Sequence, residues 1–181
     1  MDLLDFTADE MYFERPLPPA VAGLIDEASQ HYGDDAEAAE ACLRRADSLA
    51  PDHLTVLVAL YRFYFYQRRY PETLAIADRS IVITARELGI PEDWRALDQA
   101  SFGHAVQASM TLTRFLLLAM KGAGYVLLRM DRPAEALARL ECVAAFDERD
   151  RLGLTDLLSW ARDAAFRSEV EAKGDNITFI H

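Results

Sequence analysis

The chain has 181 residues, of which 51% are hydrophobic and 27% are charged, and its formal net charge at pH 7 is −11. A chain of this length can bury a core in one domain without disulfides or metal ions. The acidic charge argues against nucleic acid or an anionic membrane as the main partner, because both repel a negative surface. The charge is uneven, since residues 61–140 carry 11 basic and 8 acidic side chains, a net charge of +3 between two acidic ends.

Residues 1–19 are expected to form an extended or flexible segment. They are rich in acidic residues, and Pro16, Pro18 and Pro19 oppose a helix there. The segment lacks the basic start and the uninterrupted apolar run of a secretion signal. The most apolar stretch of the chain, Phe115–Met120, is far shorter than the roughly 20 residues that a membrane span needs. We therefore expect a cytoplasmic protein.

Residues 20–173 are expected to form one domain of helical hairpins. Three segments open with an acidic or proline-containing turn and continue as an amphipathic helix, and another amphipathic helix precedes the second and third turns. The predicted hairpin turns lie near Gly33–Asp34, Arg69–Tyr70 and Asp131–Arg132. Small and bulky residues recur at matching offsets after the turns: Ala39, Leu43 and Ala46; Thr73, Ala77 and Ser80; Ala136, Leu140 and Val143.

The periodicity is interrupted in residues 91–130. No proline occurs from Ser101 to Met130, and the apolar residues run almost continuously, which favours one long helix of roughly 45 Å. The alternative is an extra hairpin with Trp94 and Leu97 as positions of its first helix. In a long helix, the apolar residues 105–118 would exceed what one chain can cover, and a symmetric homodimer is the commonest solution.

The chain is expected to end in one further helix and a short tail. Residues 154–170 have an apolar face and a charged face, as a helix that covers the last exposed surface of a repeat array requires. Residues 174–181 form the C-terminal tail.

The hairpin pattern resembles the tetratricopeptide repeat, a 34-residue helix–turn–helix with small residues where its two helices cross. The resemblance covers roughly residues 20–86 and 117–150, and Gly124 and Ala136 occupy the crossing of the third unit. It implies an all-α fold, namely a right-handed α–α superhelix of about three hairpins with a long inserted helix and a C-terminal capping helix. The alternative is an irregular helical bundle in which the spacing is a coincidence.

Catalytic motifs are missing from the sequence. The phosphate-binding loops, the zinc-binding HExxH and the nucleophile elbow do not occur, and the four histidines lack a metal-ligand spacing. We therefore expect neither catalytic residues nor a metal or cofactor, and we interpret the chain as a protein that is not an enzyme. The alternative is a small-molecule-binding protein or an enzyme with a pocket between the long helix and the repeats, built on His104 or Trp94.

The tetratricopeptide resemblance implies a concave groove that is lined by the first helix of each hairpin. Such grooves hold a peptide or helix of a partner protein, and aromatic and arginine side chains are favoured where binding energy concentrates. The groove positions that carry over in this way are His31, Tyr32, Arg62, Phe65, Tyr66, Lys121, Tyr125 and Arg129. For Phe65 and Tyr66 a place in the core is an equal alternative, whereas Tyr64 and Leu127 are expected in the core.

The basic middle of the chain predicts a ligand that combines acidic and apolar residues. The only asparagine is Asn176, so the chain lacks the asparagine–lysine clamp with which some tetratricopeptide proteins hold a chaperone's terminal carboxylate. The resulting hypothesis is an adaptor, scaffold or small chaperone. Its overall plan is similar to that of the small tetratricopeptide chaperones of bacterial secretion systems.

Overall fold

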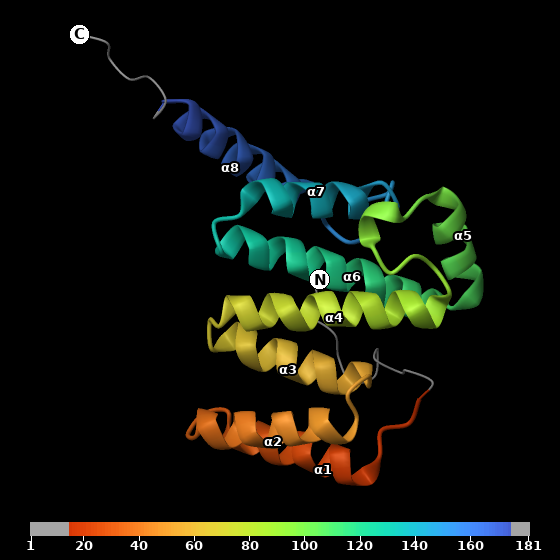
Figure 1. Cartoon of the computed structure of the whole chain (residues 1–181), viewed down its shortest axis with the longest axis vertical. Coiled ribbons are helices and arrows are strands. Elements are labelled where there is room, and N and C mark those ends of the chain that lie inside the picture. The colour runs from red at the N-terminus through yellow and green to blue at the C-terminus, as the bar shows by residue number, and fades with distance from the viewer. Residues whose placement is uncertain (1–14, 175–181) are drawn as a thin grey trace.

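The computed structural model describes residues 15–174, and in that range it contains eight α-helices, one 3-10 helix and no strand (Figure 1). The all-α class predicted from the sequence is confirmed. The helices are α1 (Pro19–His31), α2 (Ala36–Leu49), α3 (Leu54–Tyr66), α4 (Tyr70–Leu88), η1 (Trp94–Ala96), α5 (Gln99–Ala108), α6 (Met110–Arg129), α7 (Pro133–Ala144) and α8 (Thr155–Gly174).

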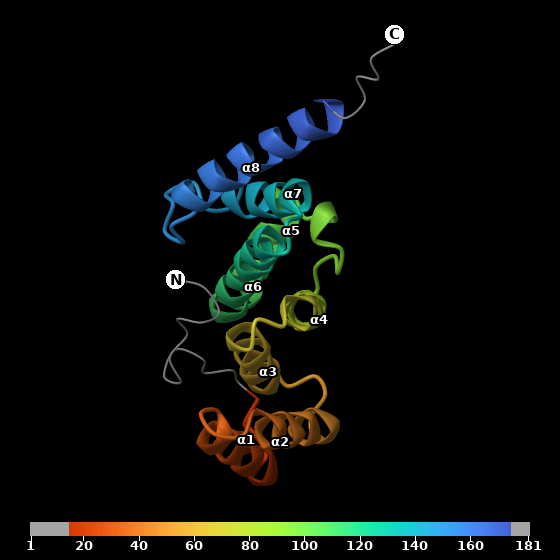
Figure 2. The same cartoon turned by 90° about the vertical axis from the view of Figure 1, so that its left-hand side faces the viewer.

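The helices pack as three consecutive hairpins, α1–α2, α3–α4 and α6–α7, with α8 against α7. Figure 2 shows α1, α3 and α6 along one side of the array and α2 and α4 along the other. The turns fall where the sequence predicted them, between His31 and Ala36, between Tyr66 and Tyr70, and between Arg129 and Pro133.

The second and third hairpins turn in the same way. Arg68 and Asp131 each adopt the left-handed conformation with φ 57°, and each lies two residues before the next helix. The following residue then donates its backbone N–H five residues back, from Arg69 to Tyr64 at 2.9 Å and from Arg132 to Leu127 at 3.0 Å. The two hairpins are therefore equivalent at their turns, although they are separated in the chain by η1 and α5.

The prediction of one long helix over residues 101–130 is wrong, because the helix is interrupted at Ser109. This residue is extended (φ −160°, ψ 113°), and its hydroxyl accepts the backbone N–H of Leu112 at 3.3 Å, which starts α6 afresh. The extra hairpin is wrong too, because Trp94 lies in a single 3-10 turn. In space α4 packs directly on α6, so that η1 and α5 form an excursion beside a continuous array.

Helix α6 is the central helix of the core. Every residue from Phe115 to Leu128 except Tyr125 is buried. Helix α6 has 20 residues, and an 18-residue window of it has a mean hydropathy of 1.3, which is the length and composition of a membrane span. However, 72% of that window is buried inside the protein. Because α4 and α7 cover α6, most of its apolar surface is buried within the chain, and Met110 is the one large apolar residue of 105–118 that is mostly exposed, at 63%. The premise that this whole stretch is in excess is therefore wrong, and the homodimer stays a prediction.

Helices α6 and α7 approach each other closely at Gly124, which was predicted to lie at their crossing. A Cβ atom added to Gly124 would lie 2.7 Å from Cγ of Leu140. Ala136, which lies one turn before Leu140 in α7, is fully buried. The small side chains therefore permit the approach that the sequence suggested.

The N-terminal boundary of the helical domain lies at Pro19, one residue before the predicted one. Pro19 occupies the first position of α1, where a missing backbone N–H costs nothing, and Pro18 precedes it as the cap residue. The expectations for residues 1–14 and 175–181 lie outside the described residues.

Candidate protein-binding surface

A cluster of aromatic rings lies where α3, α4 and α6 meet. Phe65, in the last turn of α3, is its centre and is partly buried. Its ring centroid lies 5.9 Å from that of Tyr66, 6.1 Å from that of Tyr70 and 5.9 Å from that of Tyr125. These are the separations of interacting aromatic pairs. The structure therefore brings together residues that the sequence assigned to the groove in two different hairpins.

The ring cluster continues onto α8 and ends in exposed side chains. Trp160 lies 6.1 Å from Tyr125 between ring centroids, and the guanidinium of Arg129 lies 5.4 Å above the ring of Tyr70. Tyr66 is 67% exposed and Trp160 is 41% exposed. We call this set the aromatic surface: Phe65, Tyr66, Tyr70, Tyr125, Arg129 and Trp160.

The local sequence explains how these side chains are positioned. The short turn between α3 and α4 places Tyr66 and Tyr70 at the ends of adjacent helices. Tyr125 and Arg129 are four residues apart in α6 and so share one face of that helix. Contact with the hydroxyls of Tyr125 and Tyr70 raises the pKa of Arg129, so the guanidinium stays charged at the edge of the rings.

Tyr32 and Arg62 are neighbours at the N-terminal end of the array. The ring of Tyr32 lies 5.7 Å from that of Phe63 and is 37% exposed. Burial raises the pKa of Tyr32, and the positive charge of Arg62 offsets part of that rise. His31 is partly buried in the last turn of α1. These three predicted groove residues thus lie on the first hairpin and its border with α3.

The assignment of Lys121 to the groove surface is wrong. Its side chain is 8% exposed, and its ammonium donates to the backbone oxygen of Leu152 at 2.5 Å. Its charge also contributes to lowering the pKa of Asp150, after the hydrogen bonds that this carboxylate accepts. Lys121 therefore fastens the loop between α7 and α8 to the core helix.

Two members of the aromatic surface were not among the predicted groove residues. Tyr70 was predicted as part of a hairpin turn; it is the first residue of α4, and its ring also packs on Phe65. Trp160 lies between the apolar and the charged face of α8. A large aromatic residue at such a border is the signal that could have identified it.

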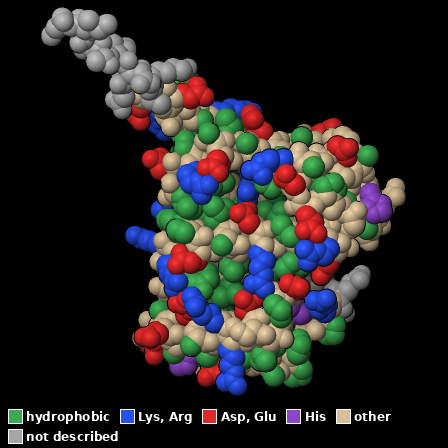
Figure 3. All heavy atoms as spheres, viewed as in Figure 1, with side chains coloured by type: hydrophobic (Ala, Val, Ile, Leu, Met, Phe, Trp, Pro, Cys, Tyr) green, Lys and Arg blue, Asp and Glu red, His purple; other side chains and the backbone are tan. Residues whose placement is uncertain are grey.

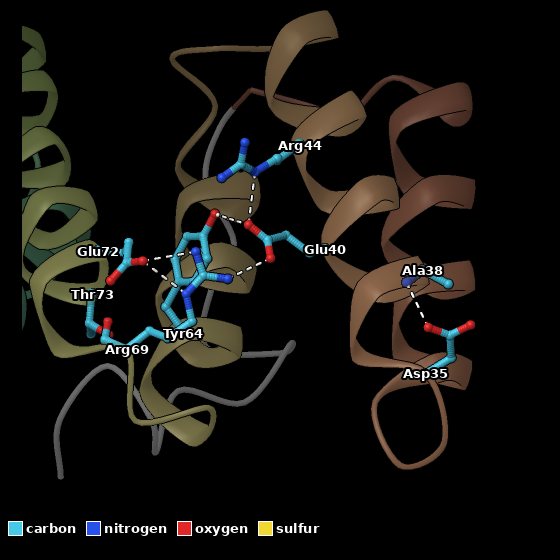
Figure 4. Close-up of polar contacts among 8 residues, drawn as sticks. All are labelled: Asp35, Ala38, Glu40, Arg44, Tyr64, Arg69, Glu72 and Thr73. Atoms are coloured by element: carbon cyan, nitrogen blue, oxygen red, sulfur yellow. Dashed lines mark hydrogen bonds and ion pairs between the residues drawn. The ribbon is translucent and has the colours of Figure 1, made fainter.

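The face of the array seen in Figure 1 carries charges of both signs among apolar side chains (Figure 3). Figure 4 shows one network in which Arg69 binds both Glu40, at 2.5 Å, and Glu72, at 2.8 Å, while the hydroxyl of Tyr64 donates to Glu40 at 3.2 Å. This network joins the first hairpin to the second.

The Glu40 network is structural. Burial alone would raise the pKa of Glu40, but the hydrogen bond and charge of Arg69, with help from Arg44, outweigh it and the pKa is lowered. A carboxylate held ionised in this way, between two arginines and a tyrosine, is a poor proton donor or acceptor near neutral pH.

A cavity of about 330 Å³ lies between α4, α7 and η1, and Trp94 forms part of its wall. Arg139, which is 7% exposed, pairs with Asp78 and stacks on the Trp94 ring at 5.0 Å. These contacts fasten η1 to α7. His104 is exposed on α5 and lies close to Gly89. Among the described residues, no three His, Cys, Asp or Glu side chains are arranged to hold a metal ion.

Comparison with known proteins identifies one family. No family model and no solved structure matches the chain. The sequence is 42% identical over 158 residues to the uncharacterized 19.8 kDa protein in the nifW 5′ region of Azotobacter chroococcum mcd 1, an alignment that covers 87% of each chain. The chain therefore belongs to the family of that Azotobacter protein.

Proposed function

We propose that this protein is an adaptor, scaffold or small chaperone that binds a peptide or helix of a partner protein on the aromatic surface. The observation that carries the proposal is the exposure of Tyr66 (67%) and Trp160 (41%) at the edges of a ring cluster that is otherwise packed. Rigid aromatic side chains presented in this way supply contact area at little entropic cost, as binding hot spots do.

The charges around the aromatic surface favour a partner with acidic and apolar residues together. Arg129 is exposed beside Tyr70 and Tyr125. The segment that supplies most of the surface, residues 61–140, has a net charge of +3 and lies between two acidic ends of the chain. An acidic residue on the ligand would meet Arg129, and an apolar residue would lie against Tyr66 and Trp160.

We also propose that the array is tetratricopeptide-like, with α1, α3 and α6 as the helices that line the binding side. Support comes from the equivalent turns at Arg68 and Asp131 and from the direct packing of α4 on α6. The close crossing at Gly124 is a further similarity.

The proposal is tested with matched baits in extracts of the cells that make the protein. Wild-type protein, Tyr66→Ala, Trp160→Ala and the control Leu49→Ala are immobilised, and the captured proteins are compared by quantitative mass spectrometry. Leu49 is a suitable control because it is 57% exposed on α2. We expect one partner to be captured by wild type and Leu49→Ala, and at least ten-fold less by the other two, since a hot-spot truncation costs about 2 kcal/mol or more.

The bait experiment also separates binding from folding. Tyr66→Ala and Leu49→Ala should retain the wild-type helicity and melting temperature, because both side chains are exposed. Capture of the same proteins by all four baits would contradict the proposal. The name of the Azotobacter relative places it in the nifW 5′ region, so the nifW product is a first candidate to include in the comparison.

A further inference from the structure

The outer face of α8 carries large apolar side chains in contact with solvent. Phe166 is 68% exposed and Val170 is 52% exposed, whereas Ala161 and Ala165 of the same helix are buried. Figure 1 shows α8 extending beyond the end of α7, so its C-terminal half projects from the array. We define the α8 outer face as Asp163, Phe166, Arg167 and Val170, which share one side of the helix by their spacing of three and four residues.

This face differs from what the end of a repeat array requires. A terminal helix that faces only water needs a polar outer side, because no further repeat covers it. The outer face of α8 instead combines two exposed apolar side chains with one acidic and one basic residue. Such a mixture is typical of a surface that another helix covers.

We propose that the α8 outer face binds α8 of a second copy of this chain, antiparallel and about a two-fold axis at the level of Ala165. In a two-fold helix pair, residues at equal distances on either side of the axis face each other. Asp163 then faces the partner's Arg167, and the same pair forms a second time by symmetry. Phe166 lies near the axis.

The charges of the face select this occupant and this orientation. A parallel pair in register would place Asp163 against the partner's Asp163, and like charges in contact are unfavourable. The antiparallel pair makes both contacts attractive with no residue from another protein. A helix of this length spans roughly 30 Å, so the interface is small, and we expect a dissociation constant in the micromolar range.

The first test is the mass of the protein across a micromolar concentration series, measured by sedimentation equilibrium. Wild type should change from one to two chain masses as the concentration rises. Phe166→Glu should remain a single chain, because the substitution buries two carboxylates at the axis. Leu49→Glu, which places the same charge on an exposed apolar site of α2, should associate like wild type.

The second test uses charge reversal. Asp163→Arg alone and Arg167→Asp alone should each associate at least ten-fold more weakly, because each homodimer contains two like-charge contacts. A mixture of the two variants should form a heterodimer with wild-type affinity, since both of its contacts pair Arg with Asp. The doubly substituted chain, Asp163→Arg with Arg167→Asp, should also regain association. It provides the test in case a single variant has lost helicity.

Three results would overturn the proposal: a single-chain mass for wild type at every concentration, an unchanged dimer in Phe166→Glu, or a mixture that fails to associate. Recovery of association in the mixture is specific to pairing between two copies of α8. A different partner protein has fixed charges, so each charge-reversed variant would bind it as weakly in the mixture as alone. The test is separate from that of the proposed function, since none of these substitutions alters a residue of the aromatic surface.

Discussion

Two helical glycines differ in their surroundings, and this difference predicts opposite effects of the same substitution. Gly124→Ala should lower the free energy of unfolding by about 1–2 kcal/mol, because the added methyl group would overlap Leu140 and the overlap outweighs the better helix propensity of alanine. Gly103→Ala should raise it by about 0.5–1 kcal/mol, because a Cβ there has open space. Urea unfolding measures both.

The comparison of the two glycine variants tests the spacing of α6 and α7. If Gly124→Ala proved as stable as Gly103→Ala, the two helices would lie farther apart than the structure places them. Both glycines are in helices, so the difference between the variants isolates the contact with Leu140.

Lys121 is a second residue for which an effect on stability can be measured separately from an effect on partner binding. Lys121→Met keeps the apolar stem and removes the hydrogen bond to Leu152, and it should cost about 1–2 kcal/mol because a buried carbonyl loses its charged donor. Chemical denaturation gives the stability, and the bait comparison gives the effect on binding. Loss of partner capture at unchanged stability would restore Lys121 to the binding surface.

The sequence shows a lysine at position 121 but does not indicate whether its side chain points into the core or toward the surface. Lys121 is buried because the loop between α7 and α8 folds over α6, and that loop has no periodicity from which its path follows. Phe65 and Tyr66 show the same limit. They are adjacent in the chain, yet one is central to the ring cluster and the other is exposed, which depends on the contact with α6.

At the scale of the element, the start of α8 depends on one carboxylate. Asp150 accepts the backbone N–H of Leu154 and the hydroxyl of Thr155, the latter at 2.5 Å. The hydrogen bond from Thr155, followed by that from Leu154, lowers the pKa of Asp150 below its ordinary value of 3.8. Because the folded pKa is depressed, the contribution to stability is complete above the ordinary value and is lost as the pH falls through the folded value.

Asp150→Asn should therefore loosen α8 at neutral pH and remove part of the acid sensitivity of that helix. Hydrogen exchange, corrected for the intrinsic rates, should be faster in the first turn of α8 at pH 7 in the variant. In wild type it should rise only below about pH 4. Asp156→Asn removes a negative charge from the first turn of α8 itself and serves as the control. Equal exchange in the two variants would show that Asp150 does not hold the helix.

Most helices were predictable because each has an amphipathic period and a turn signal on both sides. The hairpin turns at Gly33–Asp34, Arg69–Tyr70 and Asp131–Arg132 combine these signals, and the structure has turns at all three. The break at Ser109 was missed because both flanking segments are apolar and no glycine or proline marks it. The break is fixed by a serine cap and by the packing of α5 on α6.

At the scale of the whole molecule, one central helix organises the array. Helix α6 is covered by α4 on one side and α7 on the other, so its apolar sequence reflects burial within the chain. The sequence-based argument for a dimer assumed that this surface was in excess. That premise is wrong, because α6 packs on α4 although residues 89–109 separate the two helices in the chain. Among the described residues, the large apolar side chains that are exposed lie on α8, on the aromatic surface, and singly at Tyr32, Leu49 and Met110.

The aromatic surface was predictable only in part, because it is assembled from four helices. The resemblance to a repeat family indicated Phe65, Tyr66, Tyr125 and Arg129, which belong to two hairpins. Trp160 joins them from α8, about 35 residues beyond Tyr125 in the chain, through a contact that no local pattern encodes. Long-range contacts of this kind require the packing of the array.

The central claim, that the aromatic surface binds a partner protein, is tested most directly by site-specific photo-crosslinking in the cells that make the protein. A photo-reactive phenylalanine analogue replaces Tyr66 in one variant and Leu49 in the other, and both positions are exposed. We expect irradiation to attach one defined partner through position 66 and not through position 49. Attachment of the same proteins at both positions, or of none at position 66, would contradict the account.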